Sequence, residues 1–594
     1  MLLEQGRKVV LLVIKDRNYC KLILLCSIVF ICFLIGGCSF PLGGGNKLGR
    51  DMDHEFDMGS GINLSSISDE KAMDFAKLCK VWGVVKYYHP AVVAGDVNLD
   101  YELFRVMHHI LEDDVDVNSI LYERVDSLDS KDYVGYKDYE QSFPENGIQL
   151  SPSTDWCKDE EYLGKSLSNE LTSLLQYRIS ERENAYVSFK DDSLYAYMDN
   201  EDPYPNMRFD DTGYRLLGLF RYWNIIEYYF PYKDIIGEDW DHVLLEFIPK
   251  FIEGTDYNSY LMTTAELTTK IHDSHSYVMG QRKIPLINYL GMYRVPVDFV
   301  EIDNQIVISK IIQKCGLELG DIVIKVGDDD INELINSRRN FISLSREDTN
   351  VGLDLFRTPY KDTDFTVIRN GEKLDVKVMG IQNYANLNVD TKSQAMEDEN
   401  IYYINAGLLK DGEIDKIMEK WGDTKGLIID LRNYPSTPFL YELAEYLIPT
   451  QKEFFVVSIP NPAVPGEFYY LKPHVSGRPK ESNDEVYEGK VVILTNERTG
   501  SQGESTTMSL RNAPNSIVLG RTTAGTNGDV RPFKLPGSIE CRISGLGIFH
   551  PDKKPTQRIG LQPDIYLEPT IEGIKEGRDE YIEKAIEIIR ESYQ

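Results

Sequence analysis

A short apolar run followed by two closely spaced glycines and a polar segment is the feature that most constrains how this 594-residue chain can fold. Residues 491–494 (VVIL) predict a buried strand, residues 500–504 (GSQGE) a tight turn, and residues 505–510 (STTMSL) the start of a helix. Ser501 then lies at a strand-to-helix turn, where unpaired backbone N–H groups can stabilise a negative oxygen. The pattern is typical of a nucleophilic serine, and also of an ordinary serine that caps a helix.

A second cluster lies well before this turn, in residues 271–278 (IHDSHSYV). A histidine is the usual base for a serine, because its unperturbed pKa lies near neutrality and it can take and return a proton. Catalytic partners need to be adjacent only in the fold, so His275 is the candidate base and Ser274 a neighbouring candidate hydroxyl. A structural histidine or a helix-capping cluster is the alternative.

The first residues have the pattern of a targeting segment. A mostly apolar run from 22 to 37 follows Arg17 and Lys21 and is shorter than a spanning helix normally requires. It ends in LIGGC, which resembles the bacterial lipobox and makes Cys38 the candidate lipidated residue. We therefore expect a signal peptide at 1–37, a flexible tether at 38–66 and a protein anchored in the bacterial cell envelope by lipid, most simply facing the periplasm. An uncleaved membrane anchor is the alternative.

Residues 67–280 are expected to be helical and contain an internal repeat. Residues 82–90 (WGVVKYYHP) match residues 223–231 (WNIIEYYFP), and each copy predicts an amphipathic helix that ends at a proline and is followed by a second helix. The repeated aromatic residues could bind a ligand. Aromatic residues at helical spacing are more often part of a core.

The residue pattern changes at residues 281–382, where short runs typical of β-strands predominate. Residues 316–321 (GLELGD) resemble the glycine-leucine, glycine-aspartate step of a PDZ domain, which binds an extended peptide along the edge of its sheet. A small β-barrel without a ligand is the alternative. In the remaining part, 383–594, residues 426–433 (GLIIDLRN) predict a parallel core strand that ends in a polar loop, where α/β sheets place their sites.

Charge and composition exclude several classes of function. The net charge is −31, from 64 basic and 95 acidic side chains, which disfavours nucleic acid and anionic lipid as partners. The sequence has no C-x-x-C pair and no H-E-x-x-H, so we expect no metal and no cofactor. One disulfide is conceivable in an oxidising compartment. Its candidates are Cys79, Cys157, Cys315 and Cys541.

Taken in order, these segments resemble the C-terminal processing (tail-specific) peptidases and their tricorn-core and retinoid-binding-protein relatives. The resemblance covers roughly residues 265–570 and includes residues 560–564 (GLQPD) in addition to the motifs above. It implies a multidomain α+β protein with a helical N-terminal repeat region, a PDZ-like domain and a crotonase-like α/β serine peptidase core. It also implies that Ser501 is the nucleophile and that the substrate is a peptide or protein.

One departure from the family pattern concerns the base. Serine-lysine members carry a lysine after the serine, whereas residues 524–528 here read AGTNG. The tricorn-like branch uses serine and histidine with a hydroxyl just before the histidine, and Ser274-His275 fits that arrangement. The group that orients the histidine is not decided by the sequence. The candidates are Glu504, Asp273 and Gln557, of which Gln557 lies in the segment before Gly560 that matches the family's position.

The resemblance also implies an oxyanion hole. One donor is the backbone N–H of Gln502, and the second comes from the 433–436 loop, through Tyr434 or Ser436, because Pro435 has no N–H. We therefore expect peptide hydrolysis through an acyl-enzyme. The alternatives are a non-catalytic PDZ-like peptide- or ligand-binding lipoprotein, a serine esterase, and a protein that sequesters apolar ligands.

Overall fold

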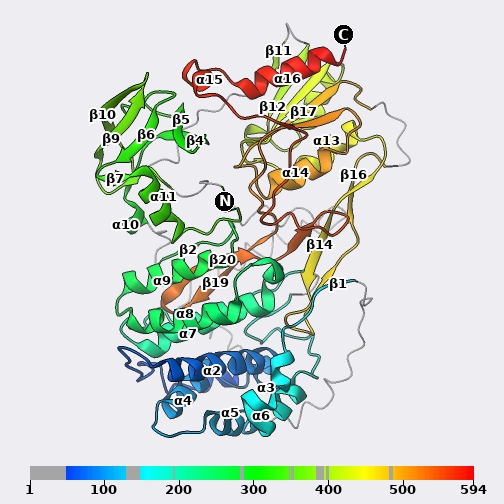
Figure 1. Cartoon of the computed structure of the whole chain (residues 1–594). Coiled ribbons are helices and arrows are strands. Elements are labelled where there is room, and N and C mark those ends of the chain that lie inside the picture. The colour runs from blue at the N-terminus through cyan, green and yellow to red at the C-terminus, as the bar shows by residue number, and fades with distance from the viewer. Residues whose placement is uncertain are drawn as a thin grey trace, which may run out of the picture. The chain divides into compact units, whose positions relative to one another are not determined.

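The computed structural model describes residues 48–128, 147–190, 194–280, 287–346, 348, 354–382, 393–396, 400–479 and 486–593. The predicted signal peptide and Cys38 lie outside this part of the chain. All elements named below belong to one compact unit, Gly49–Gln594. Figure 1 shows them from the N-terminal helices to the sheet that lies near the C-terminus.

Residues 69–269 form a largely helical region. Helix α2 (Asp69–Tyr88) begins where the Ser68 side chain accepts the Lys71 N–H, and it ends just before Pro90, which cannot continue it. Helix α7 (Thr212–Tyr229) begins at the Asp211 cap and is buried along almost its whole length. The other helices are α3 (Pro90–Ala94), α4 (Leu99–Ile110), α5 (Val117–Asp126), α6 (Glu160–Leu174), α8 (Trp240–Glu253) and α9 (Tyr257–Thr269).

The two copies of the repeat make the same contact. The Trp82 indole donates to the Leu99 carbonyl at 2.9 Å, and the Trp223 indole donates to the Trp240 carbonyl at 2.8 Å. In both copies the tryptophan of a long helix therefore binds the first residue of another helix. The repeated aromatic residues belong to the hydrophobic core, which favours the packing interpretation. They are Trp82, Tyr87, Tyr88, Trp223, Tyr228 and Tyr229.

The expected tether is too long, because its C-terminal part is packed. Phe56 and Ile62 are buried in the helical core. The Ser60 N–H donates to Asp211 Oδ2 at 2.7 Å, and Asp211 is also the residue that caps α7. The polar composition of this segment indicated a flexible tether, although a few apolar side chains hold it against the helices.

A small antiparallel sheet follows, with the strand order β10-β9-β6-β5-β4 and β7 paired to β6. Strand β4 lies at the edge of this order, so one side of its backbone has no partner strand within the described part of the chain. The strands are β4 (Val297–Ile302), β5 (Gln305–Ile311), β6 (Ile322–Val326), β7 (Asp329–Asp330), β9 (Asp362–Arg369) and β10 (Glu372–Met379). Beside them lie α10 (Ile287–Leu290), α11 (Ile331–Arg339), and the pair β3 (Tyr293–Arg294) and β8 (Arg357–Thr358).

The C-terminal sheet has the order β11-β12-β13-β17-β18-β22, and every pair except β11 with β12 is parallel. Helices α12, α13 and α14 pack on one face and α16 on the other, which explains the uniformly apolar strands. The strands are β11 (Gln394–Met396), β12 (Ile401–Asn405), β13 (Gly426–Asp430), β17 (Lys490–Thr495), β18 (Ser516–Gly520) and β22 (Ile565–Tyr566). The helices are α12 (Ile414–Trp421), α13 (Leu440–Leu447), α14 (Gln502–Leu510), α15 (Ile571–Lys575) and α16 (Glu580–Glu591).

Two further sheets pack against helices, one against α13 and α14 and the other against α7 and α9. One has the order β1-β15-β14-β16 with β21 paired to β14, and the other β19-β20-β2. The pairing of β2 with β20 sets Val278 opposite Cys541, and so brings the segment after His275 against the segment before Ser544. The strands are β1 (Ile148–Leu150), β2 (Val278–Met279), β14 (Lys452–Pro460), β15 (Phe468–Tyr470), β16 (His474–Ser476), β19 (Val530–Leu535), β20 (Ile539–Ser544) and β21 (Gly547–Phe549).

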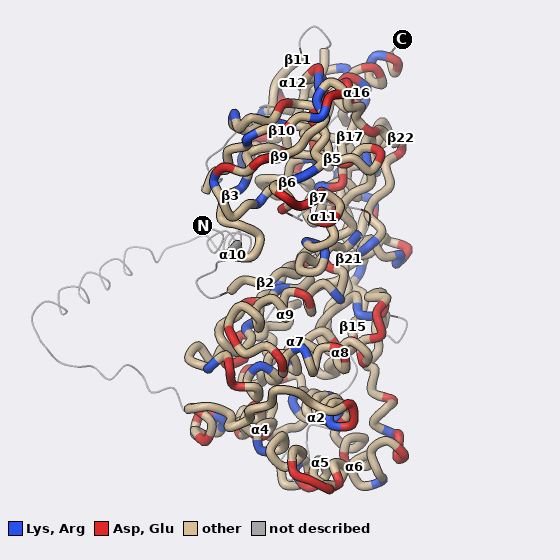
Figure 2. The backbone as a smooth tube through the Cα atoms, turned by 60° about the vertical axis from the view of Figure 1, so that its left-hand side comes forward, with Lys and Arg blue, Asp and Glu red and all other residues tan. Residues whose placement is uncertain are grey.

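Acidic and basic residues are intermingled over the tube of the described chain (Figure 2). Among the described residues, no helix is both long enough and apolar enough to cross a membrane. Cys79, Cys157, Cys315 and Cys541 are all buried free thiols, so the disulfide considered from the sequence is not formed.

Candidate active site

Ser501 occupies the sharp turn between β17 and α14. Its φ of 51° and ψ of −117° lie in a region that residues with a side chain rarely adopt, and such strain is concentrated at functional sites. The turn is held because the Ser501 N–H donates to the Thr526 carbonyl at 2.7 Å. Although Ser501 is the N-cap residue of α14, its side chain makes no capping hydrogen bond. The ordinary helix-cap interpretation therefore does not describe this serine.

Glu504, in the first turn of α14, holds the loop that runs beside Ser501. Its fully buried carboxyl accepts the N–H groups of Gly525 at 2.9 Å and Thr526 at 3.1 Å, and the hydroxyl of Thr523. Burial raises the pKa of Glu504 to about 7, although these hydrogen bonds oppose the rise. None of the hydrogen bonds found for this carboxyl among the described residues involves His275. Glu504 thus fixes the loop, and the structure does not bring it to the imidazole.

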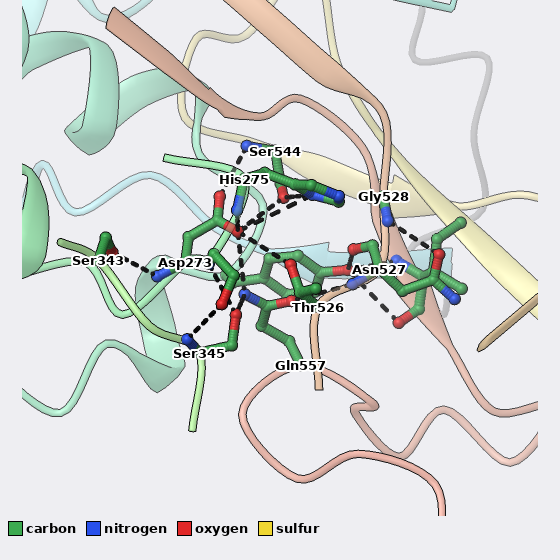
Figure 3. Close-up of polar contacts among 12 residues, drawn as sticks. Asp273, His275, Ser343, Ser345, Thr526, Asn527, Gly528, Ser544 and Gln557 are labelled. Carbon is green, nitrogen blue, oxygen red and sulfur yellow. Dashed lines mark hydrogen bonds and ion pairs between the residues drawn. The ribbon is translucent and has the colours of Figure 1, made fainter. Parts of the chain in front are cut away.

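His275 belongs to a separate cluster that is centred on the buried carboxylate of Asp273 (Figure 3). Ser544 Oγ lies 2.9 Å from His275 Nδ1, and Asp273 Oδ1 lies 3.9 Å from the same nitrogen. The Gln557 side-chain amide donates to Asp273 Oδ1 at 3.3 Å. Of the three sequence candidates for the orienting group, Asp273 is therefore the carboxylate that lies beside the histidine.

Ser274 faces another segment. Its N–H donates to Ser345 Oγ, and its hydroxyl accepts the Ser345 N–H, each at 2.8 Å. The Asp273 N–H donates to Ser343 Oγ at 3.1 Å. These bonds fix the 273–275 turn against residues 343–345, so the structure gives Ser274 a part in positioning this turn.

Thr526 connects the serine side and the histidine side. Its carbonyl accepts the Ser501 N–H at 2.7 Å, and its hydroxyl lies 3.5 Å from Asp273 Oδ1. The structure thereby brings Ser501, Asp273 and His275 around one loop. Within the described part of the chain, Ser501 Oγ and the His275 ring are not directly hydrogen-bonded, and such bonds are often long before substrate binds.

The proposed oxyanion donors lie on two adjoining segments. The Gln502 side chain donates to the Thr437 carbonyl at 2.8 Å, which ties the start of α14 to the 433–437 loop. The Ser436 N–H already donates to the Ala406 carbonyl at 3.0 Å, so it is not available in this structure. The Tyr434 side chain is 59% exposed, and no hydrogen bond of the Tyr434 N–H is found among the described residues. Of the two sequence candidates for the second donor, the Tyr434 N–H is the one that remains.

Among the described residues, no group of three or more histidine, cysteine, aspartate and glutamate residues is arranged to hold a metal ion. The groups that the site brings together are a hydroxyl, an imidazole, a buried carboxylate and backbone N–H groups.

Residues 400–567 match the model of peptidase family S41. A search of curated proteins found no match. Among solved structures, mature CPAF complexed with lactacystin is similar at 13% identity and a TM-score of 0.50, covering 64% of this chain and 99% of that one. The photosystem II D1 C-terminal processing protease (14% identity, TM-score 0.38, covering 62% of this chain and 98% of that one) and the tricorn protease (16% identity, TM-score 0.35, 64% and 37%) were also found.

The likeness to CPAF concerns the fold alone. The matched residues contain β12, β13, β17, α14 and the Ser501 turn. Residues 400–567 thus carry a peptidase S41 domain, the domain of the C-terminal processing peptidases, and the Ser501 turn lies inside it.

Two residues of the site, Ser544 and Thr526, were not predicted from the sequence. Ser544 ends strand β20 in an unremarkable segment, and the only signal for it is the pairing of β20 with β2. Thr526 lies in the segment 524–528, where serine-lysine members of the family carry their lysine.

Proposed function

We propose that this peptidase cleaves peptide bonds through an acyl-enzyme on Ser501, with His275 as the base. The Ser501 proton passes to His275 Nε2 while Oγ forms a bond to the substrate carbonyl carbon. The oxyanion accepts the N–H groups of Gln502 and Tyr434, each contributing about 3 kcal/mol to the transition state. The imidazolium then gives its proton to the leaving amine, and water releases the acyl group by the same route.

The strained, uncapped Ser501 at the N-terminus of α14 is the observation that carries this proposal most directly. Such a conformation costs about 1–3 kcal/mol and is retained where the surroundings hold it for a purpose. Here the Thr526 carbonyl and the Glu504-bound loop hold it.

The test compares Ser501→Ala with Ser509→Ala. Ser509 lies in the same helix, is buried and bonds Ser476 Oγ at 2.8 Å. We expect Ser501→Ala to lose both fluorophosphonate labelling and peptide cleavage, and Ser509→Ala to retain both. Cleavage that survives Ser501→Ala would refute the assignment. Labelling without peptide cleavage would point to an esterase, and a wild-type protein with neither to a binding protein.

We further propose that the small sheet is a PDZ-like domain that receives the C-terminal tail of the substrate along β4. The proposal is supported by the edge position of β4 and by a cavity of about 420 Å³ that β4 lines together with residues of the peptidase core. The two sides already touch, because Arg498 donates to the Phe299 carbonyl at 3.1 Å and Arg521 to the Glu301 carbonyl at 3.2 Å.

A free carboxylate at the end of the tail gains charge-assisted hydrogen bonds that an amide cannot match. We therefore expect the KM of a peptide with a free C-terminus to be about tenfold lower than that of its C-terminal amide. Equal KM values would make the small sheet a structural insert.

The cell envelope remains the proposed location, with a lipid on Cys38 as the anchor. Cys38→Ser should leave the precursor uncleaved and remove metabolic labelling by palmitate. Labelling that persists would indicate acylation at Cys20, Cys26 or Cys32.

A further inference from the structure

The group in contact with the His275 ring nitrogen is a hydroxyl. Ser544 Oγ lies 2.9 Å from Nδ1 and also 3.1 Å from Asp273 Oδ1, whereas Asp273 Oδ1 and Nδ1 are 3.9 Å apart. The hydroxyl therefore stands between the carboxylate and the imidazole (Figure 3). Ser544 is completely buried, and nothing assigned from the sequence included it.

Counting hydrogens defines the direction of both bonds. A serine hydroxyl has one hydrogen, and an ionised carboxylate only accepts. The Ser544 hydrogen therefore goes to Asp273 Oδ1, and Ser544 Oγ accepts the hydrogen on His275 Nδ1. The Nε2 lone pair is then free. This is the tautomer that can take a proton from a serine nucleophile.

Both carboxylate oxygens of Asp273 accept hydrogen bonds from groups other than the imidazole. Oδ2 accepts the Ser544 N–H at 2.8 Å, and Oδ1 accepts the His275 N–H at 3.0 Å. The Gln557 amide adds a third donor. Because both oxygens are engaged, the hydroxyl of Ser544 supplies the remaining link to Nδ1.

The other candidates do not fill this place. Glu504 is bound to Thr523 and to the N–H groups of Gly525 and Thr526. Gln557 carries no charge and uses its NH₂ on Asp273. A neutral residue at this position supports Asp273 and cannot replace its negative charge.

We propose that Asp273 orients His275 through the Ser544 hydroxyl, which makes Ser544 a positioning residue of the reaction. When Nε2 takes the Ser501 proton, the imidazolium keeps its Nδ1–H on Ser544, and the polarised hydroxyl passes the stabilisation from Asp273 to the ring. The inference rests on the proposed acyl-enzyme function.

A double-mutant cycle on the full chain tests this link. Ser544→Ala, Asp273→Asn and the double variant are compared by kcat and KM on one fluorogenic peptide and by the rate of fluorophosphonate labelling. We expect Ser544→Ala to lower kcat about 10- to 100-fold, as loss of an orienting partner does, with KM within about twofold. Asp273→Asn should lower kcat about 10³- to 10⁴-fold.

The decisive result is the double variant. If Ser544 transmits the effect of Asp273, adding Ser544→Ala to Asp273→Asn should lower kcat by less than about threefold further. A loss equal to the product of the two single losses would overturn the relay, and so would a Ser544→Ala variant with the wild-type kcat.

Stability is controlled separately. Ser168→Ala removes another buried serine hydroxyl, which bonds the Cys157 carbonyl at 2.8 Å in the helical region, and should leave kcat unchanged. If Ser544→Ala does not fold, Ser544→Cys takes its place, because a thiol keeps the shape but is a weak donor. A wild-type kcat for Ser544→Cys would overturn the relay. Wild-type protein that is not labelled at Ser501 would refute the proposed function itself, and the relay with it.

Discussion

The serine side and the histidine side of the site are built in different ways. The serine side comes from one continuous segment, β17, the turn and α14, with the 523–526 loop bound to it through Glu504. The histidine side joins four segments far apart in the chain, which contribute residues 273–275, 343–345, Ser544 and Gln557.

The difference shows what each side depends on. On the serine side, the turn between β17 and α14 places the N–H groups of α14 beside Ser501, and one further segment, the loop that contains Thr526, holds the Ser501 backbone. The tautomer and orientation of His275 depend on long-range pairing, since β2 must meet β20 before Ser544 reaches the ring. Damage far from Ser501 can therefore abolish the reaction without disturbing the nucleophile.

The largest expected effect tests whether the two sides act as one unit. His275→Ala and Ser501→Ala should each lower kcat about 10⁶-fold, and the double variant should lose no more than either single variant. The reason is that neither group can transfer the proton alone. Single-turnover cleavage of one peptide by all three variants provides the measurement. Losses that multiply would show that the two residues act independently and that the base lies elsewhere.

The second effect concerns Glu504, which belongs to the serine side alone. Because its pKa is raised from 4.5 to about 7, the folded protein binds this proton more tightly than the unfolded chain. The resulting stabilisation is complete below about pH 4.5 and is lost as the pH rises through about 7. Glu504→Gln removes this dependence, so its cost relative to wild type should shrink between pH 5 and pH 8, by up to about 3 kcal/mol.

Urea unfolding at the two pH values measures this difference. Glu583→Gln is the control, because it removes a charge at an exposed site that is paired with Arg578. A cost for Glu504→Gln that is the same at pH 5 and pH 8 would contradict the raised pKa.

The serine side could largely be predicted from the sequence. The apolar run and the glycines indicated the strand, the turn and the helix, which begins at Gln502 where the sequence suggested Ser505. The raised pKa of Glu504 could not be predicted, because it depends on the burial of this carboxyl by tertiary packing.

On the histidine side, three residues could be predicted as candidates for the group that orients His275, and the choice among them could not be made from the sequence. Asp273, Glu504 and Gln557 all carry groups that can bond an imidazole, and all three lie in one connected network. Only the distances from each side chain to the His275 ring distinguish the three candidates. The sequence also expected Ser436 as a donor, and could not show that the Ala406 carbonyl already uses its N–H.

A third prediction concerns Tyr232, which joins the helical region to the loop between the two sides. Its hydroxyl donates to the Asn527 carbonyl and accepts the Ile548 N–H, each at 2.7 Å. Tyr232→Phe leaves both buried groups unpaired and should lower the free energy of unfolding by about 1–3 kcal/mol. Tyr260→Phe is the matched control, because its buried hydroxyl has no protein partner among the described residues. Equal changes in the two variants, measured by urea unfolding, would mean that the Tyr232 bonds contribute nothing specific.

The smallest expected effect tests whether the serine side is coupled to the edge of the small sheet. Arg498 lies three residues before Ser501, donates to the Phe299 carbonyl of β4 and forms an ion pair with Asp298 at 3.2 Å. This pair is partly exposed, so Arg498→Ala should change the free energy of unfolding by no more than about 1 kcal/mol.

A tail that adds to β4 must displace the guanidinium from the Phe299 carbonyl. Without Arg498 that cost disappears, and the KM for a peptide with a free C-terminus should fall about fivefold while kcat is retained. Arg511→Ala, which removes a comparable surface pair with Asp564 at 3.1 Å, should leave KM unchanged. If both variants keep the wild-type KM, substrate tails do not use this edge. If Arg498→Ala instead lowers kcat, the arginine helps to hold the Ser501 turn. The serine side would then depend on the small sheet as well as on its own continuous segment.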